Sequence, residues 1–153
     1  MIAFCGPCRV DLKEMVDQED VKAKAPIRSP LMLHFMAEFF GENLETTIVR
    51  QRLLMACVLE ALRENAPTVP FRRDGDDIYV GPKKMSVSIA TASPVSTLIH
   101  AGLNITTKGT PIPTYGLKDA KIEPKEFALA VLKAFQKETE EMDLARCKVR
   151  GVP

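Results

Sequence analysis

The fold of this chain is decided by residues 76–106, DDIYVGPKKMSVSIATASPVSTLIHAGLNIT. Apolar and polar residues alternate over 84–90 and again over 97–106, the period of two that is typical of β-strands. Ser93-Pro94 separates the two runs and predicts a turn. We therefore expect an antiparallel hairpin, preceded by a short strand at 76–80.

The flanking sequence adds helices and further strands to this hairpin. Residues 31–40 alternate and predict a long strand, with Leu33, Phe35, Ala37 and Phe39 on one face. Apolar residues at helical spacing predict a helix over 44–64 and a second one that begins at Pro124. Short strands are predicted at 1–10 and 146–150, and loops at 11–25, 65–75 and 107–121. This order predicts an α+β fold, a mostly antiparallel sheet with helices on one face.

Length and composition narrow the class of protein. With 153 residues, the chain is expected to form a single domain over 1–153. Its 21 Lys and Arg against 20 Asp and Glu, together with 46% hydrophobic residues, argue against disorder and against a strongly cationic nucleic-acid binder. There is no apolar run long enough for a membrane span and no signal peptide, and the four cysteines are expected to be free thiols in the cytoplasm.

Antiparallel pairing across the 93–94 turn predicts a polar face on the hairpin. It would place Lys84 opposite residues 102–104 and Ser88 near residues 98–100. The residues expected on this face are Lys84, Ser86, Ser88, His100 and Asn104, with Gly102 leaving room for a ligand. A lysine ammonium beside hydroxyl groups suits an anionic ligand. A solvated outer face has the same composition, so both interpretations stay open.

Acidic residues are absent from 78 to 118, a span that holds four lysines. Such a span makes a locally positive field that favours phosphate or carboxylate ligands. Asp76 and Asp77 stand just before it. Because adjacent strand residues face opposite ways, only one of them is expected to reach the same site, where it could hold Mg²⁺. The alternative is a polar loop end.

The tetrapeptide Cys5-Gly6-Pro7-Cys8 is identical to the thioredoxin active-site motif. A thioredoxin dithiol needs a preceding strand and a helix that starts at the first cysteine. Only four residues precede Cys5, so a turn containing Gly-Pro is the favoured interpretation and dithiol redox chemistry the alternative. His34, alone on its strand face without a reachable carboxylate, is interpreted as a structural histidine.

Residues 76–80 (DDIYV), 83–90 (KKMSVSIA) and 100–105 (HAGLNI) together resemble the core of biotin and lipoate protein ligases. In that superfamily an Asn-Asp-hydrophobic strand leads to a Lys-x-Ser-Gly-Ser-Ala strand and then to a His-His-Gly-Thr-Leu-Leu-Leu-Asn-like strand. The whole chain resembles an uncharacterised prokaryotic family, domain of unknown function number three-six-six. The implied fold is the class II aminoacyl-tRNA synthetase and biotin synthetase fold, with an N-terminal portion missing.

The resemblance implies roles for individual residues. Lys84 would bind the α-phosphate and the acyl carbonyl of an acyl-adenylate, and Asp76-Asp77 would lie near nucleotide and metal. The remaining matches are Ser86 and Ser88 beneath the ligand, Asn104 at the end of the next strand, and Arg28-Ser29 in place of a glycine-rich arginine segment. ATP and Mg²⁺ would be the cofactors. Val87 departs from the pattern, because it replaces the ligase glycine.

Three functions follow from this sequence. The first is binding of a nucleotide, acyl-adenylate or small carboxylate at Lys84, with acyl transfer to an acceptor protein as the reaction. The second is a non-catalytic binding or assembly module of the same fold, and the third is the dithiol redox protein. Unpaired sheet edges favour a homodimer.

Overall fold

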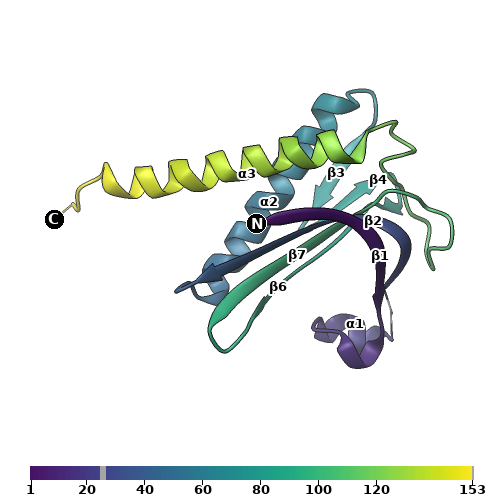
Figure 1. The fold of residues 1–153 in the computed structure, drawn as a ribbon, viewed down its shortest axis with the longest axis horizontal. Coiled ribbons are helices and arrows are strands. Elements are labelled where there is room, and N and C mark those ends of the chain that lie inside the picture. The colour runs from purple at the N-terminus through teal and green to yellow at the C-terminus, as the bar shows by residue number, and fades with distance from the viewer. Residues whose placement is uncertain (25–26, 153) are drawn as a thin grey trace.

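The computed structural model describes residues 1–24 and 27–152 (Figure 1). The first half contains β1 (Ile2–Val10), η1 (Leu12–Glu14), α1 (Gln18–Ala23), β2 (Ile27–Phe40) and α2 (Leu44–Asn65). The second half contains β3 (Phe71–Asp74), β4 (Asp77–Val80), β5 (Lys83–Lys84), β6 (Ser86–Ala92), β7 (Ser96–Asn104) and α3 (Pro124–Cys147). This is the α+β architecture that the sequence predicts.

The strands form two sheets, both antiparallel. The larger sheet has the order β1-β2-β7-β6, and the smaller one has the order β3-β4-β5. Met85 lies at the break between β5 and β6, where the chain passes from the small sheet to the large one. Its carbonyl oxygen accepts the amide of Asn104, and its amide donates to Ile78. The two sheets are therefore joined at the residue that follows Lys84.

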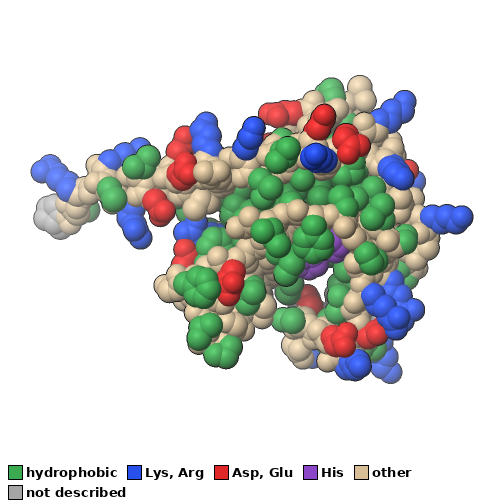
Figure 2. All heavy atoms as spheres, viewed as in Figure 1, with side chains coloured by type: hydrophobic (Ala, Val, Ile, Leu, Met, Phe, Trp, Pro, Cys, Tyr) green, Lys and Arg blue, Asp and Glu red, His purple; other side chains and the backbone are tan. Residues whose placement is uncertain are grey.

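Helices α2 and α3 cover one face of the large sheet (Figure 1). The predicted inner face of β2 is confirmed, since Leu33, Phe35 and Ala37 are buried in the core. Helix α2 begins at an Asn43 cap, whose side chain accepts the amide of Thr46. The C-terminal part of α3 extends past the sheet and carries mixed charges on its surface (Figure 2). This layering leaves the other sheet face for a second element.

That second element is the segment 12–23, which contains η1 and α1 where a loop was expected. The polar sequence of this segment shows little helical periodicity. Among its side chains that the structure describes, only that of Met15 is buried. Two other expectations were also wrong. Residues 71–74 form β3, because they pair with β4 across the Gly75 turn. The tail expected as a strand at 146–150 instead continues α3 to Cys147.

The register of the central hairpin differs from the predicted one. Ser86 pairs with Leu103 and Ser88 with Ala101, whereas Lys84 pairs with Tyr79 in the small sheet. Because paired residues share a face, both serines lie on the helix-covered side of the sheet. His100 and Gly102 lie on the opposite side. The polar residues predicted to share one face therefore lie on two faces. The prediction assumed one continuous strand from Lys84 onward, whereas the strand is interrupted at Met85.

Candidate functional site

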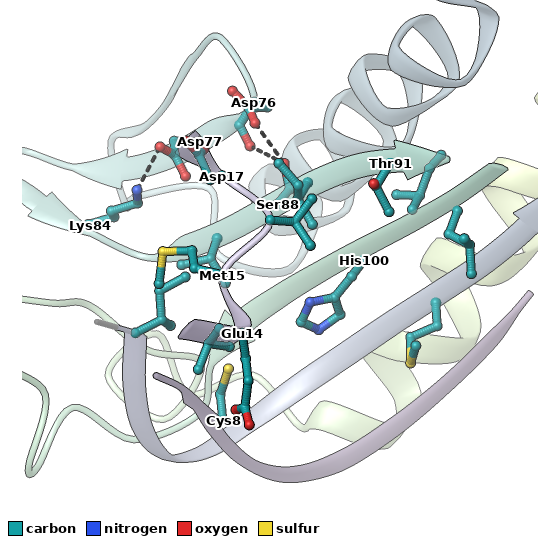
Figure 3. A pocket seen from close by; sticks show the side chains of 18 residues that line it. Cys8, Glu14, Met15, Asp17, Asp76, Asp77, Lys84, Ser88, Thr91 and His100 are labelled. Atoms are coloured by element: carbon teal, nitrogen blue, oxygen red, sulfur yellow. Dashed lines mark hydrogen bonds and ion pairs between the residues drawn. The ribbon is translucent and has the colours of Figure 1, made fainter. Parts of the chain in front are cut away.

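A cavity of about 510 Å³ lies on the face of the large sheet that the long helices leave uncovered. Its floor is formed by side chains of β6 and β7, its wall by the segment around η1, and one side by the residues around β4 and β5 (Figure 3). In the space-filling view, purple histidine atoms border a hollow between the sheet and this segment (Figure 2). The polar groups in its lining are Cys8, Glu14, Asp17, Asp76, Asp77, Lys84, Ser88, Thr91 and His100.

A second, smaller cavity of about 130 Å³ lies on another side of Lys84. Lys84, Val87 and Ile27 line both cavities. The candidate residues in the smaller one are Arg28, Ser29, Ser86 and Asn104. The structure thus distributes the predicted site residues over two spaces that share Lys84, except for Gly102, which lines neither.

Lys84 lies against a carboxylate in this structure. Its Nζ is 2.8 Å from Oδ2 of Asp77, and both side chains are largely buried. Burial raises the pKa of the Asp77 carboxyl above its ordinary value, although the hydrogen bond and charge of Lys84 act in the opposite direction. The ammonium therefore stabilises an Asp77 carboxylate that burial disfavours.

Asp76 is held from the opposite side, by helix α2. Gln51 donates from Nε2 to Asp76 Oδ2 at 2.9 Å and to Ser88 Oγ at 2.7 Å. Ser88 Oγ in turn donates to Asp76 Oδ2 at 3.1 Å, and Arg52 Nη1 lies 3.3 Å from Asp76 Oδ1. The two aspartates have different partners, yet both line the large cavity. Strand alternation predicted that only one of the two aspartates would reach the site, whereas both reach the same cavity.

The other predicted residues have mostly structural contacts. Ser86 Oγ accepts the amide of Ile78 at 2.8 Å, and Asn104 donates from Nδ2 to the Met85 carbonyl at 3.3 Å. Arg28 pairs with Asp11 at 3.4 Å through an exposed side chain. Ser29 Oγ is buried and has no partner among the described residues. The contacts of Ser86 and Asn104 thus hold the junction of the two sheets beside Lys84, whereas Arg28 and Ser29 do not contribute to it.

The expected room beside Gly102 is already filled. A Cβ built on Gly102 would lie 2.9 Å from Met32 Cε and 3.4 Å from Val87 Cγ2. A side chain at this position would have to displace the terminal methyl group of Met32, and Val87 lines both cavities beside it.

His100 has a partner that the sequence reading missed. Its Nε2 lies 2.9 Å from Nδ1 of His34, and Nε2 of His34 lies 3.2 Å from the Gly6 carbonyl oxygen. The two histidines are 66 positions apart in the sequence, and the pairing of Met36 with His100 in β2 and β7 brings them together. In the sequence pattern, each histidine lies on the strand face opposite the apolar one. This shared placement was the signal that the two side chains could meet if the strands pair.

The Cys-Gly-Pro-Cys segment lies inside strand β1 and does not form the expected turn. Cys5 pairs with Leu33 and Cys8 with Ser29, with a bulge between Gly6 and Cys8. Cys5 is exposed and Cys8 is buried, and burial raises the pKa of the Cys8 thiol. No helix begins at Cys5 to stabilise a thiolate, so this geometry does not favour dithiol redox chemistry.

Within residues 1–24 and 27–152, no group of three or more His, Cys, Asp or Glu side chains is placed to hold a metal ion. None of the helices in the described part of the chain is long and apolar enough to cross a membrane. Asp76 and Asp77 are neighbouring carboxylates that line the large cavity, and each has a cationic partner, Arg52 and Lys84 respectively.

The family model described as "Domain of unknown function (DUF366)" matches residues 1–150. The chain belongs to this family. An uncharacterised protein of Methanocaldococcus jannaschii is 33% identical over 148 residues, which cover 90% of this chain and 66% of that protein. This chain therefore spans just under two thirds of that relative's length.

Solved structures extend the likeness to the fold. A protein of unknown function from Pyrococcus horikoshi is 39% identical, with a TM-score of 0.90 over 99% of this chain and 81% of that one. Biotin protein ligase from Aquifex aeolicus is 23% identical, with a TM-score of 0.60 over 72% of this chain and 53% of that one. Lipoate-protein ligase A bound with ATP is 15% identical, with a TM-score of 0.60 over 90% and 73%. These likenesses establish the fold as that of biotin and lipoate protein ligases.

Proposed function

We propose that this domain binds an acyl-adenylate, or the nucleotide and carboxylic acid that form it, in the two cavities that share Lys84. The observation that carries this proposal is the position of Lys84, which lines both spaces and projects from the sheet junction. A single ammonium there can contact a ligand that occupies both cavities. Ligases of this fold bind such ligands: one solved structure is the Aquifex aeolicus enzyme in complex with biotin and ATP.

The chemistry that fits is carboxylate activation. A carboxylate oxygen attacks the α-phosphorus of ATP, the bond to the bridging oxygen of pyrophosphate breaks, and pyrophosphate leaves. A nucleophile on an acceptor protein then attacks the acyl carbonyl and releases AMP. Lys84 would stabilise the negative charge that develops on the α-phosphate and on the carbonyl oxygen. Asp76 and Asp77 would hold Mg²⁺, which neutralises phosphate charge when bound.

The decisive experiment is exchange of labelled pyrophosphate into ATP across a panel of carboxylic acids. We expect at least one acid to support exchange, and we expect Lys84→Ala to lower its rate by about 100-fold. Lys83→Ala is the matched control, because Lys83 is the exposed neighbour of Lys84. The proposal fails if no acid supports exchange and Lys84→Ala binds ATP as the wild type does.

A second candidate is a non-catalytic binding module of the same fold. Two observations favour it: Val87 lines the cavity at the position where the ligase pattern has glycine, and the Asp77 carboxylate offsets the charge of Lys84. This module would bind ATP or an acid, with affinity sensitive to Lys84→Ala, and would show no pyrophosphate exchange.

A further inference from the structure

The chain has two histidines, and they form a hydrogen-bonded pair at the floor of the large cavity. His34 is buried between two rings, stacked against Phe4 at 4.9 Å and against His100 at 5.2 Å between centroids. His100 is only partly buried and lines the cavity, where Figure 3 shows its ring near the segment that contains Glu14 and Met15.

The hydrogen bonds determine where the protons of a neutral pair lie. The Gly6 carbonyl can only accept, so His34 must donate to it from Nε2. The Nδ1 atom of a neutral His34 then carries a lone pair, and His100 donates to it from Nε2. A neutral His100 consequently has its lone pair on Nδ1. Within the described part of the chain, that nitrogen has no hydrogen-bond partner.

Protonation of the pair reverses the character of His100 Nδ1. If the added charge stays on His100, both of its nitrogens carry hydrogen. If the Nε2 proton of His100 moves to His34 Nδ1, the charge lies on His34 and His100 still carries hydrogen on Nδ1. In either case one proton changes Nδ1 from an acceptor into a donor.

The surroundings of His100 favour its neutral form. Burial lowers the pKa of His100, and the charge of His34 lowers it further. The other titratable groups that line the cavity are Cys8 from β1, Glu14 and Asp17 from the η1 segment, and Asp76, Asp77 and Lys84 from the small-sheet side. Apolar side chains form the rest of the floor, among them Val87, Ile89 and Leu98.

We propose that His100 Nδ1 recognises the cavity's ligand by accepting a hydrogen bond from a neutral O–H or N–H group on an apolar body. The ligand class is therefore a carboxylic acid whose hydrocarbon chain bears a distal hydrogen-bond donor. Only the carboxylate end, at Lys84, rests on the proposed function. His34 acts as a positioning residue, because it holds His100 in the tautomer that leaves Nδ1 free to accept.

The proton arrangement can be tested in the ligand-free protein by ¹⁵N–¹H correlation of the imidazole nitrogens between about pH 4.5 and 9. The two histidines give an unambiguous spectrum. We expect His34 to be protonated on Nε2 throughout, and His100 Nδ1 to be unprotonated at neutral pH. On acidification, His100 Nδ1 should become protonated below the ordinary histidine range. A His34 Nε2 without hydrogen, or a hydrogen on His100 Nδ1 at pH 8, would overturn the proposal.

Ligand recognition can be tested by calorimetry with three series of straight-chain acids of about five to ten carbons. The series carry a terminal hydroxyl, a terminal methyl ether or a plain methyl group. We expect the best hydroxy acid to bind about tenfold more tightly than its ether and alkyl counterparts at neutral pH. This preference should disappear in His100→Phe and at any pH at which the ¹⁵N–¹H spectra show His100 Nδ1 protonated. It should survive in His34→Gln at neutral pH, because the glutamine side-chain oxygen still accepts from His100 Nε2.

Equal binding of the three series, binding of none of them, or a preference that His100→Phe retains would each refute the inference. Lys84→Ala should weaken all series alike, so the two proposals fail separately. A hydroxy-acid preference without pyrophosphate exchange would refute the acyl-activation reaction alone.

Discussion

Lys84 Nζ lies 2.8 Å from Asp77 Oδ2 at the junction of the two sheets. Strand β4 supplies the acid and strand β5 the base, and Tyr79 and Lys84 are paired across them. The ammonium that we propose to bind phosphate is thus matched to a carboxylate in the ligand-free protein. A nucleotide without Mg²⁺ would approach this carboxylate at a cost in Coulomb energy.

We therefore expect Asp77→Asn to tighten binding of ATP about fivefold in the absence of Mg²⁺ and to weaken it when Mg²⁺ is present. Calorimetry with and without the cation measures both effects. Asp74→Asn is the matched control, because Asp74 is an exposed aspartate of the same small sheet. If the affinity for ATP is unchanged under both conditions, Asp77 does not interact with the bound nucleotide.

Stability should depend on pH through His100. Its pKa in the folded protein lies below the ordinary 6.5, so the unfolded chain takes up the proton first as the pH falls. The free energy of unfolding should decrease from about pH 6.5 downward until the folded pKa is passed, and this term should be absent at higher pH. Urea titrations of wild type and His100→Gln check this, since the difference between them should shrink on acidification. A constant difference would contradict it.

Gln51 should stabilise the fold through its two hydrogen bonds to Asp76 and Ser88. Because this amide is buried, Gln51→Leu should lower the free energy of unfolding by about 1–3 kcal/mol. Gln136→Leu removes a helical glutamine with an exposed partner and should change it by less than about 0.5 kcal/mol. If urea denaturation shows the same loss of unfolding free energy for both variants, the hydrogen bonds of Gln51 do not stabilise the fold.

Val87→Ala should widen the large cavity at the place where Val87 projects over the sheet. We expect wider, branched acids to gain several-fold in affinity, while the free energy of unfolding falls by about 1 kcal/mol. Val95→Ala, at an exposed position of the same hairpin, should alter neither quantity. A branched-acid affinity unchanged by Val87→Ala would place the acyl group elsewhere.

The four thiols should fall into two classes on reaction with DTNB at pH 8. Cys5 and Cys147 are exposed and should react within seconds to minutes, whereas Cys8 and Cys57 are buried. Burial raises the pKa of Cys8, and it raises that of Cys57 to about 11, so these thiols should react only on unfolding. Fast reaction of Cys8 together with Cys5 would reopen the dithiol interpretation.

Most of the fold was predictable because the decisive segments have strong periodicity. Strand β2, helix α2 and the β6–β7 hairpin each alternate or repeat over many residues, and the presence of all three was correctly predicted. The start of β2 at Ile27 and the register of the hairpin were not. Strand β3 was not, because four residues show too little pattern to be distinguished from a loop. The segment 12–23 was missed for a related reason: Met15 is its one buried residue among the described side chains, and the segment has no apolar stripe of its own.

The amino-acid sequence by itself determined the α+β class, the inner face of β2 and the acid-free stretch around Lys84, since these depend on local order along the chain. Tertiary structure decided which side chains meet. The break at Met85 turns Ser86 and Ser88 toward helix α2, while the pairing of β2 with β7 joins His34 to His100. A strand pattern specifies which residues share a face but not which neighbour faces them, because register is a property of two segments packed together.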